Sequence, residues 1–149
     1  MEQPIGITLK IKDLFFDRKR VVRAVDKAKR KVLSRIGAFI RTAARTSIRS
    51  RKGTSKPGQP PYSHTGLLRK WILFGSDPQA DSVVIGPVGF KNSQAPHVLE
   101  FSGETKAPRW WQKRLGKKRI RIRPHPFMGP ALEKERAKLP AMWAGSVKG

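Results

Sequence analysis

Apolar residues alternate with small or polar ones near the amino terminus. Residues 5–11 read IGITLKI, with isoleucine or leucine at every second position. A period of two places these apolar side chains on one face of an extended chain, as in a half-buried strand. The pattern therefore predicts a β-strand over residues 5–11.

A helical pattern follows over residues 17–50. Apolar residues recur there every three or four positions, as on a helix with one buried face; they are Val21, Val25, Ala28, Val32, Ile36, Phe39, Ile40, Ala43 and Ile48. Asp17 can cap the start, and Gly53 follows the end. Such a helix would be about 50 Å long unless Gly37 marks a bend or break. We expect part of it to contact another molecule, because one small domain cannot cover it.

The middle of the chain reads as a stiff connector followed by strands. Pro57, Gly58, Pro60 and Pro61 exclude a helix from residues 53–66. Residues 67–76 and 82–88 have strand composition and flank the turn DPQAD, within a sheet region that we place at residues 67–103. Residues 97–103 fit either a short helix or a strand.

The last third is predicted as a basic extended insert over residues 104–123 and a helix over residues 128–145. Pro130 suits the first turn of this helix, and Pro140 would kink it or end it. The expected fold is a single α+β domain over residues 1–149, in which a long basic N-terminal helix packs on a small antiparallel sheet. The core is predicted to contain Val32, Ile36, Phe39, Trp71, Leu73, Val84, Phe127 and Leu132.

The charge balance predicts a partner. The chain has 33 Lys plus Arg against 10 Asp plus Glu, a net charge of +23. Self-repulsion of this size indicates that a polyanion or an acidic protein surface lies nearby. The chain has no cysteine, which excludes disulfides and thiol chemistry. It also lacks a standard signal peptide pattern and a long apolar run, so we expect a protein that is neither exported by that route nor membrane-spanning.

No arrangement of residues predicts catalysis. His64, His97 and His125 lie more than 25 residues apart, without the short spacing that places two zinc ligands on one helix face. The SHTG segment is not a nucleophile elbow, and GPVGF does not continue as a dinucleotide-binding loop. We therefore expect no enzymatic activity, no metal site and no cofactor.

Two groups of cations and a tryptophan pair are candidate contact residues. Arg41, Arg45 and Arg49 repeat every four positions and form one stripe on the predicted helix. The second group is Lys117, Lys118, Arg119, Arg121 and Arg123. Each group could be a solvated face or a surface that binds phosphates or acidic side chains. Trp110 and Trp111, which lie among cations, could stack on bases or anchor a protein contact.

Four segments in order resemble a known family. They are KPGQPPYSHTGLLRKWI (56–72), VVIGPVG (83–89), APHVLEFSG (95–103) and RPHPFMGPALEKE (123–135). This order resembles the neck or tail-completion proteins of long-tailed double-stranded-DNA bacteriophages, often labelled minor tail or tail-component proteins and including the lambda Z type. In that family the first segment leads into an antiparallel sheet, the third follows the sheet, and the fourth starts the final helix. The matching positions are Thr65, Gly66, Leu68, Arg69, Ala95, Pro96, Glu100, Phe101, Gly103, Arg123, Pro124, Phe127, Pro130, Ala131 and Leu132.

The chain departs from the family pattern at three places. Ser102 separates Phe101 from Gly103, and His125 with Pro126 separates Pro124 from Phe127. The basic insert is also longer than the family pattern.

The resemblance implies a structural protein of the virion, assembled in the bacterial cytoplasm. It would form a homo-oligomeric ring of six copies or a multiple at the head–tail junction, contact connector, tail terminator or tail tube proteins, and surround a channel that DNA traverses. The candidate subunit interface is Pro57, Gly58, Pro60, Pro61, Trp110 and Trp111. Acidic neighbours would match most of the cations, because a channel that binds phosphates tightly would retard DNA ejection. The alternative is a basic nucleic-acid-binding protein. Neither function involves a membrane or a small-molecule substrate.

Overall fold

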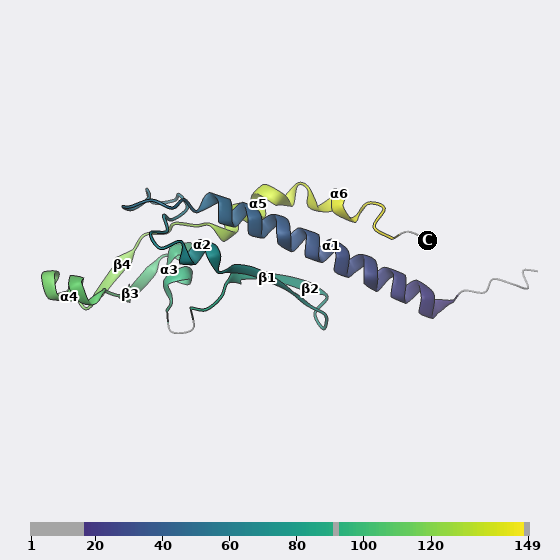
Figure 1. The fold of residues 1–149 in the computed structure, drawn as a ribbon, viewed down its shortest axis with the longest axis horizontal. Helices are drawn as coiled ribbons and strands as arrows, with labels where there is room; N and C mark the ends of the chain where they lie inside the picture. Colours follow the sequence, from purple (N-terminus) through teal and green to yellow (C-terminus); the bar gives the residue numbers. More distant parts are fainter. Residues whose placement is uncertain (1–16, 91–92, 148–149) are drawn as a thin grey trace, which may run out of the picture.

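The computed structural model describes residues 17–90 and 93–147 of the chain (Figure 1). The strand predicted over residues 5–11 lies outside these residues. The described part is an α+β fold, as predicted, with one long helix, two small antiparallel sheets and several short helices.

The long helix α1 (Arg18–Ser47) confirms the prediction for the first third of the chain. Asp17 caps it, because its Oδ1 accepts a hydrogen bond from the Arg20 backbone N–H at 3.0 Å. The buried face of α1 comprises Ala28, Val32, Ile36, Gly37, Ile40, Ala43 and Ala44. Three valines in the first turns of α1 are exposed: Val21, Val22 and Val25. The rest of the described chain therefore does not cover the N-terminal part of the apolar face of α1.

Gly37 marks a close contact and not a break. The helix is continuous through this position, and Gly37 is buried against the β1–β2 hairpin described below. A Cβ atom at position 37 would lie 2.6 Å from Phe74 Cδ2 and 2.9 Å from Val83 Cγ2. Glycine at this position therefore lets the helix and the hairpin approach each other closely.

The predicted hairpin is confirmed, with shorter strands. β1 (Ile72–Asp77) pairs antiparallel with β2 (Ser82–Pro87), in a register that sets Ile72 opposite Pro87 and Asp77 opposite Ser82. Asp77 Oδ1 closes the turn by accepting hydrogen bonds from the backbone N–H groups of Gln79 at 3.0 Å and Ala80 at 3.3 Å.

The start of the predicted first strand is instead a single helical turn, α2 (Leu67–Lys70). Gly66 precedes it in the left-handed region at φ 72°. The turn closes through a hydrogen bond from the Trp71 N–H to the Leu67 carbonyl at 2.9 Å. The stiff loop therefore enters the sheet through a helical turn.

A side-chain contact ties the tip of the hairpin to α1. Lys29 Nζ donates a hydrogen bond to Asp81 Oδ2 at 2.8 Å. This hydrogen bond raises the pKa of Lys29 above its ordinary value, because it stabilises the charged ammonium form.

The predicted core was partly wrong. Val32, Ile36 and Phe127 are buried, as expected. Trp71, Leu73, Val84, Phe39 and Leu132 are exposed by 40% or more. In the hairpin, Ile72, Phe74, Val83 and Ile85 take the inner positions, since alternate residues of a strand face opposite sides. Both faces of the hairpin carry apolar residues, so the period of two does not identify the inner face.

Residues 95–122 form a unit of two strands and two helices. α3 (Ala95–Phe101) resolves the ambiguity over residues 97–103 in favour of a helix, followed directly by β3 (Gly103–Lys106). β3 pairs antiparallel with β4 (Arg119–Ile122), and α4 (Arg109–Leu115) lies between the two strands in sequence. The prediction of a wholly extended insert over residues 104–123 was therefore wrong. Pro108 before α4 and the left-handed Gly116 after it bound this helix.

The C-terminal helix is divided in two. α5 (Met128–Arg136) packs along α1, and α6 (Leu139–Trp143) follows it (Figure 1). Pro130 lies in the first turn of α5, as predicted. Pro140 lies in the first turn of α6, where its missing N–H is tolerated, so it starts a second helix after the break at residues 137–138.

The contact at Gly37 generates a stability prediction. We expect Gly37→Ala to lower the free energy of unfolding by about 1–2 kcal/mol, measured by urea denaturation. Overpacking against Phe74 and Val83 costs about 1–3 kcal/mol, which outweighs the gain of up to about 1 kcal/mol in helix propensity.

The control combines Gly37→Ala with Phe74→Leu. The smaller side chain relieves the clash, so the effects of the two changes should be less than additive. A stabilised Gly37→Ala protein, or strictly additive effects, would contradict the close contact.

Candidate assembly surface

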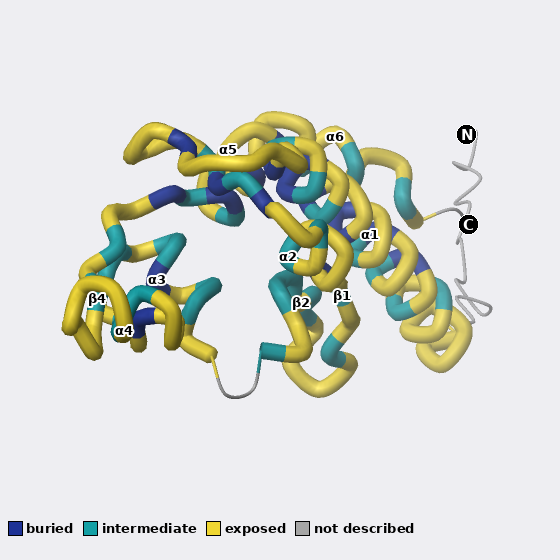
Figure 2. Tube along the Cα trace, turned by 60° about the vertical axis from the view of Figure 1, so that its left-hand side comes forward, coloured by how far each residue is buried: buried dark blue, intermediate teal, exposed yellow. Residues whose placement is uncertain are grey.

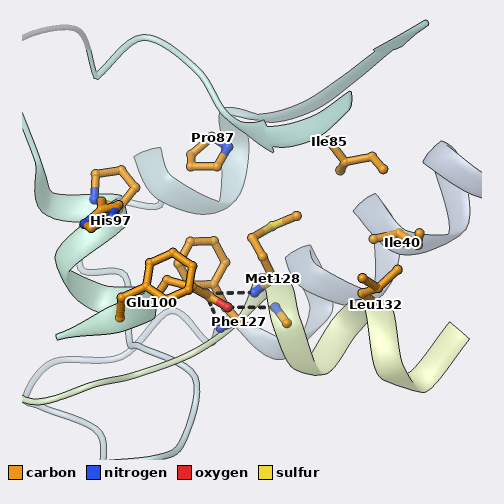
Figure 3. A pocket seen from close by; sticks show the side chains of 11 residues that line it. Ile40, Ile85, Pro87, His97, Glu100, Phe127, Met128 and Leu132 are labelled. Carbon is orange, nitrogen blue, oxygen red and sulfur yellow. Dashed lines mark hydrogen bonds between the residues drawn. The ribbon is translucent and has the colours of Figure 1, made fainter. Parts of the chain in front are cut away.

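Glu100 joins two of the segments that carry the family resemblance. It projects from α3 toward the start of α5 (Figure 3). Its Oε2 accepts hydrogen bonds from the backbone N–H groups of Phe127 at 2.9 Å and Met128 at 3.0 Å, and its Oε1 accepts one from Gly129 at 2.7 Å. A carboxylate from a distant helix thus satisfies the unpaired N–H groups at the α5 N-terminus.

An open apolar groove lies beside this cap (Figure 3). Its volume is about 540 Å³, and residues from α1, β2, α3 and α5 line it: Ile40, Ile85, Pro87, Pro96, His97, Glu100, Phe101, Phe127, Met128, Gly129 and Leu132. Phe101 is 70% exposed and packs against the His97 ring at a centroid distance of 5.1 Å. A concave apolar surface with an exposed phenylalanine is a typical docking surface.

The stiff loop is bound to its own chain. The Gly58 N–H donates to the Pro124 carbonyl at 2.8 Å, and Ser55 Oγ is hydrogen-bonded to buried His125 Nδ1 at 2.8 Å. Of the four loop residues predicted as a subunit interface, Pro61 is buried, Pro60 is half-buried, and Pro57 and Gly58 are exposed. The loop therefore clamps the segment that leads into α5, and of the four predicted interface residues Pro57 and Gly58 are exposed to a neighbour.

The tryptophan pair lies on α4, at the opposite end of the molecule from the start of α1 (Figure 1). Trp110 is 61% exposed, whereas Trp111 is half-buried. The two rings meet edge to face with centroids 5.4 Å apart. Trp110 is thus the member of the pair that is placed for an external contact.

The predicted arginine stripe on α1 is partly structural. Arg41 Nε donates a hydrogen bond to the Ile72 carbonyl at 2.8 Å, so this side chain holds β1 against the helix. Arg41 and Arg45 are half-buried, and Arg49 is exposed. The Arg49 carbonyl accepts a hydrogen bond from the Ser63 N–H at 3.0 Å. The stripe does not form a continuous exposed surface.

Every residue of the second group of cations is exposed. Lys117 and Lys118 precede β4, Arg119 and Arg121 lie on it, and Arg123 follows it. Lys117, Lys118 and Arg119 lie at the α4 end of the β3–β4 ribbon, whereas Arg123 lies at its α3 end. Figure 2 shows α4, largely coloured as exposed, beside β4.

Sequence reasoning missed the roles of Glu100 and His125. Glu100 lies 27 residues from Phe127, and His125 lies 70 residues from Ser55. Neither separation produces a local pattern. The only signal for Glu100 is its place in the APHVLEFSG segment, which carries no information on the partner of its side chain.

Comparison of the chain with protein-family models, with curated proteins and with solved structures gave no match. Within residues 17–90 and 93–147, no group of three or more His, Asp or Glu side chains is placed to hold a metal ion. No helix in the described ranges is long and apolar enough to cross a bilayer.

The cap on α5 generates a second stability prediction. We expect Glu100→Gln to lower the free energy of unfolding by about 1.5–3 kcal/mol, because a charged acceptor of three hydrogen bonds becomes a neutral amide with one acceptor oxygen. Thermal and urea unfolding, followed by circular dichroism, would measure the loss.

Glu133→Gln is the matched control. Glu133 is an exposed residue of the same helix, and its carboxylate pairs with Arg136 at 3.3 Å. Its loss should change stability by no more than about 0.5 kcal/mol. Equal losses in the two variants would show that the cap contributes little.

Proposed function

We propose that this protein is a structural component of the head–tail junction of a long-tailed double-stranded-DNA bacteriophage, where it forms a homo-oligomeric ring. The ordered segments of the sequence motivate the proposal. Its structural support is that two of these segments meet at Glu100 and the start of α5, beside an open apolar groove. If these segments build one functional surface, they are expected to lie together in the fold although they are far apart in sequence.

The groove is the observation that carries the assembly function. Its exposed apolar residues include Phe101 and Leu132. A partner that covers them removes apolar surface from water, which lowers the free energy of the complex. The occupant in this proposal is a neighbouring copy of the chain. Rings form from contacts in which different patches of successive copies meet, and the chain carries other exposed apolar side chains, such as Trp143, that could enter such a groove.

Net charge limits when such a ring forms. Each copy carries a charge of +23, so copies repel one another until acidic neighbours or DNA neutralise them. The purified protein is therefore expected to be monomeric or loosely associated, and the ring to form on its phage partners. This behaviour suits a protein that completes a tail and that should not assemble prematurely.

A groove variant tests the proposal. We expect Phe101→Asp to abolish the joining of heads to tails, because it places a charge in a surface that assembly must desolvate. Since Phe101 is 70% exposed, the melting temperature should stay near that of the wild type. Electron microscopy of particles made without the wild-type chain, and complemented with the variant, would count joined virions.

Val147→Asp is the control for added charge. Val147 is 53% exposed and lies after α6, away from the groove, so this variant should support normal joining. Normal virions with Phe101→Asp, or mature particles that lack the chain altogether, would overturn the proposed function.

A further inference from the structure

The basic arm, defined as residues 103–123, is a separate surface with its own chemistry. It comprises β3, α4 and β4 and projects at one end of the molecule (Figure 1). Its nine cations are all exposed: Lys106, Arg109, Lys113, Arg114, Lys117, Lys118, Arg119, Arg121 and Arg123. Glu104 is its only acidic residue, and no ion pair among the described residues involves an arm cation.

The charged side chains of β3 and β4 lie on one face of the two-stranded ribbon. Exposure alternates along both strands, with Glu104, Lys106, Arg119 and Arg121 exposed and Thr105, Ile120 and Ile122 half-buried. Successive exposed side chains on a strand are about 6.6 Å apart. The exposed face is therefore a regular row of arginines, which Arg123 continues beyond the strand.

The pairing register brings like charges together. Lys106 lies directly opposite Arg119, and Glu104 lies opposite Arg121. Like charges on opposed positions destabilise a ribbon. Glu104 compensates the charge of Arg121, but no acid stands opposite Lys106 or Arg119. The folded arm therefore retains a repulsion between Lys106 and Arg119 that a bound polyanion would relieve.

The chemistry of this face favours nucleic acid over an acidic protein. The buried centre of a protein–protein interface is depleted in charge, whereas DNA interfaces are strongly positive. The exposed face of the ribbon offers Lys106, Arg119 and Arg121 against one acid, Glu104, and no apolar centre. A two-stranded ribbon also fits the width of the DNA major groove, and arginines bind the flanking phosphates.

We propose that the basic arm binds the phosphate backbone of duplex DNA, independently of sequence. Arg119, Arg121 and Arg123 make the principal contacts, and α4 adds Arg109 and Lys113 at the end of the arm. This site is distinct from the half-buried arginine stripe on α1. It differs from the sequence-based expectation that acidic neighbours match most of the charge, and it does not depend on the head–tail proposal.

The test measures affinity of the full chain for a labelled duplex of about 25 base pairs, by fluorescence anisotropy from about 50 to 200 mM NaCl. The test variant is Arg119→Gln/Arg121→Gln/Arg123→Gln. The magnitude of the log–log salt slope should fall by about three units, with a loss of about tenfold or more in affinity, alike for unrelated sequences.

The matched control is Arg18→Gln/Arg20→Gln/Arg23→Gln, at three exposed positions in the first turns of α1. It lowers the net charge of +23 by the same three units. Its salt slope should stay within about one unit of the wild type. Equal losses in the two variants would overturn the proposal, because they would show a response to net charge alone.

Two competition experiments distinguish duplex DNA from an acidic protein and from single-stranded nucleic acid as the partner of the arm. Polyglutamate that displaces the duplex at equal charge concentration would overturn the proposal in favour of an acidic protein. Tighter binding of a single-stranded oligonucleotide, lost on Trp110→Ala, would overturn it in favour of base stacking. Because the assay uses the purified chain and DNA, its outcome is separate from that of the virion-joining experiment.

Discussion

The apolar face of α1 between Ala28 and Ile48 is the constraint on which the fold depends. The β1–β2 hairpin and α5 both pack on it, and from Val32 onward its residues form one buried cluster with Ile72, Phe127 and Ala131. One helix has one such face, so the two partners must share it. Gly37 lets the hairpin approach the helix closely on one side of this face. The turns of α1 before Ala28 have no comparable cover in the described chain, and their valines remain exposed.

The rest of the molecule is attached to this core by polar contacts as well as by apolar packing, which includes Leu68 of α2 and Leu99 of α3. α3 is held at the start of α5 by the three hydrogen bonds to Glu100 and by one from the His125 N–H to the Leu99 carbonyl at 2.6 Å. The stiff loop reaches the same segment through Ser55 and Gly58. Because α3 runs directly into β3, these few bonds also orient the basic arm. A small number of long-range contacts therefore positions α3, the stiff loop and the arm.

The sequence predicted the elements that have strong local signals. The 3.6-residue period and Asp17 identified α1, and the turn between residues 77 and 82 identified the hairpin. Which face of the hairpin is buried could not be predicted, because Leu73 and Val84 are as apolar as Phe74 and Val83. The α4 helix was missed because its cations carry no apolar period. The roles of Glu100 and His125 depend on partners 27 and 70 residues away, and only the folded chain brings them together.

The groove and the basic arm differ in chemistry but share α3. Glu100 lines the groove while it caps α5, and Phe101 at the groove lies two residues before β3. A subunit docked in the groove would therefore contact the helix that leads into the arm. α3 is therefore the element that the groove and the basic arm have in common, and the three hydrogen bonds that Glu100 accepts hold this helix at the start of α5.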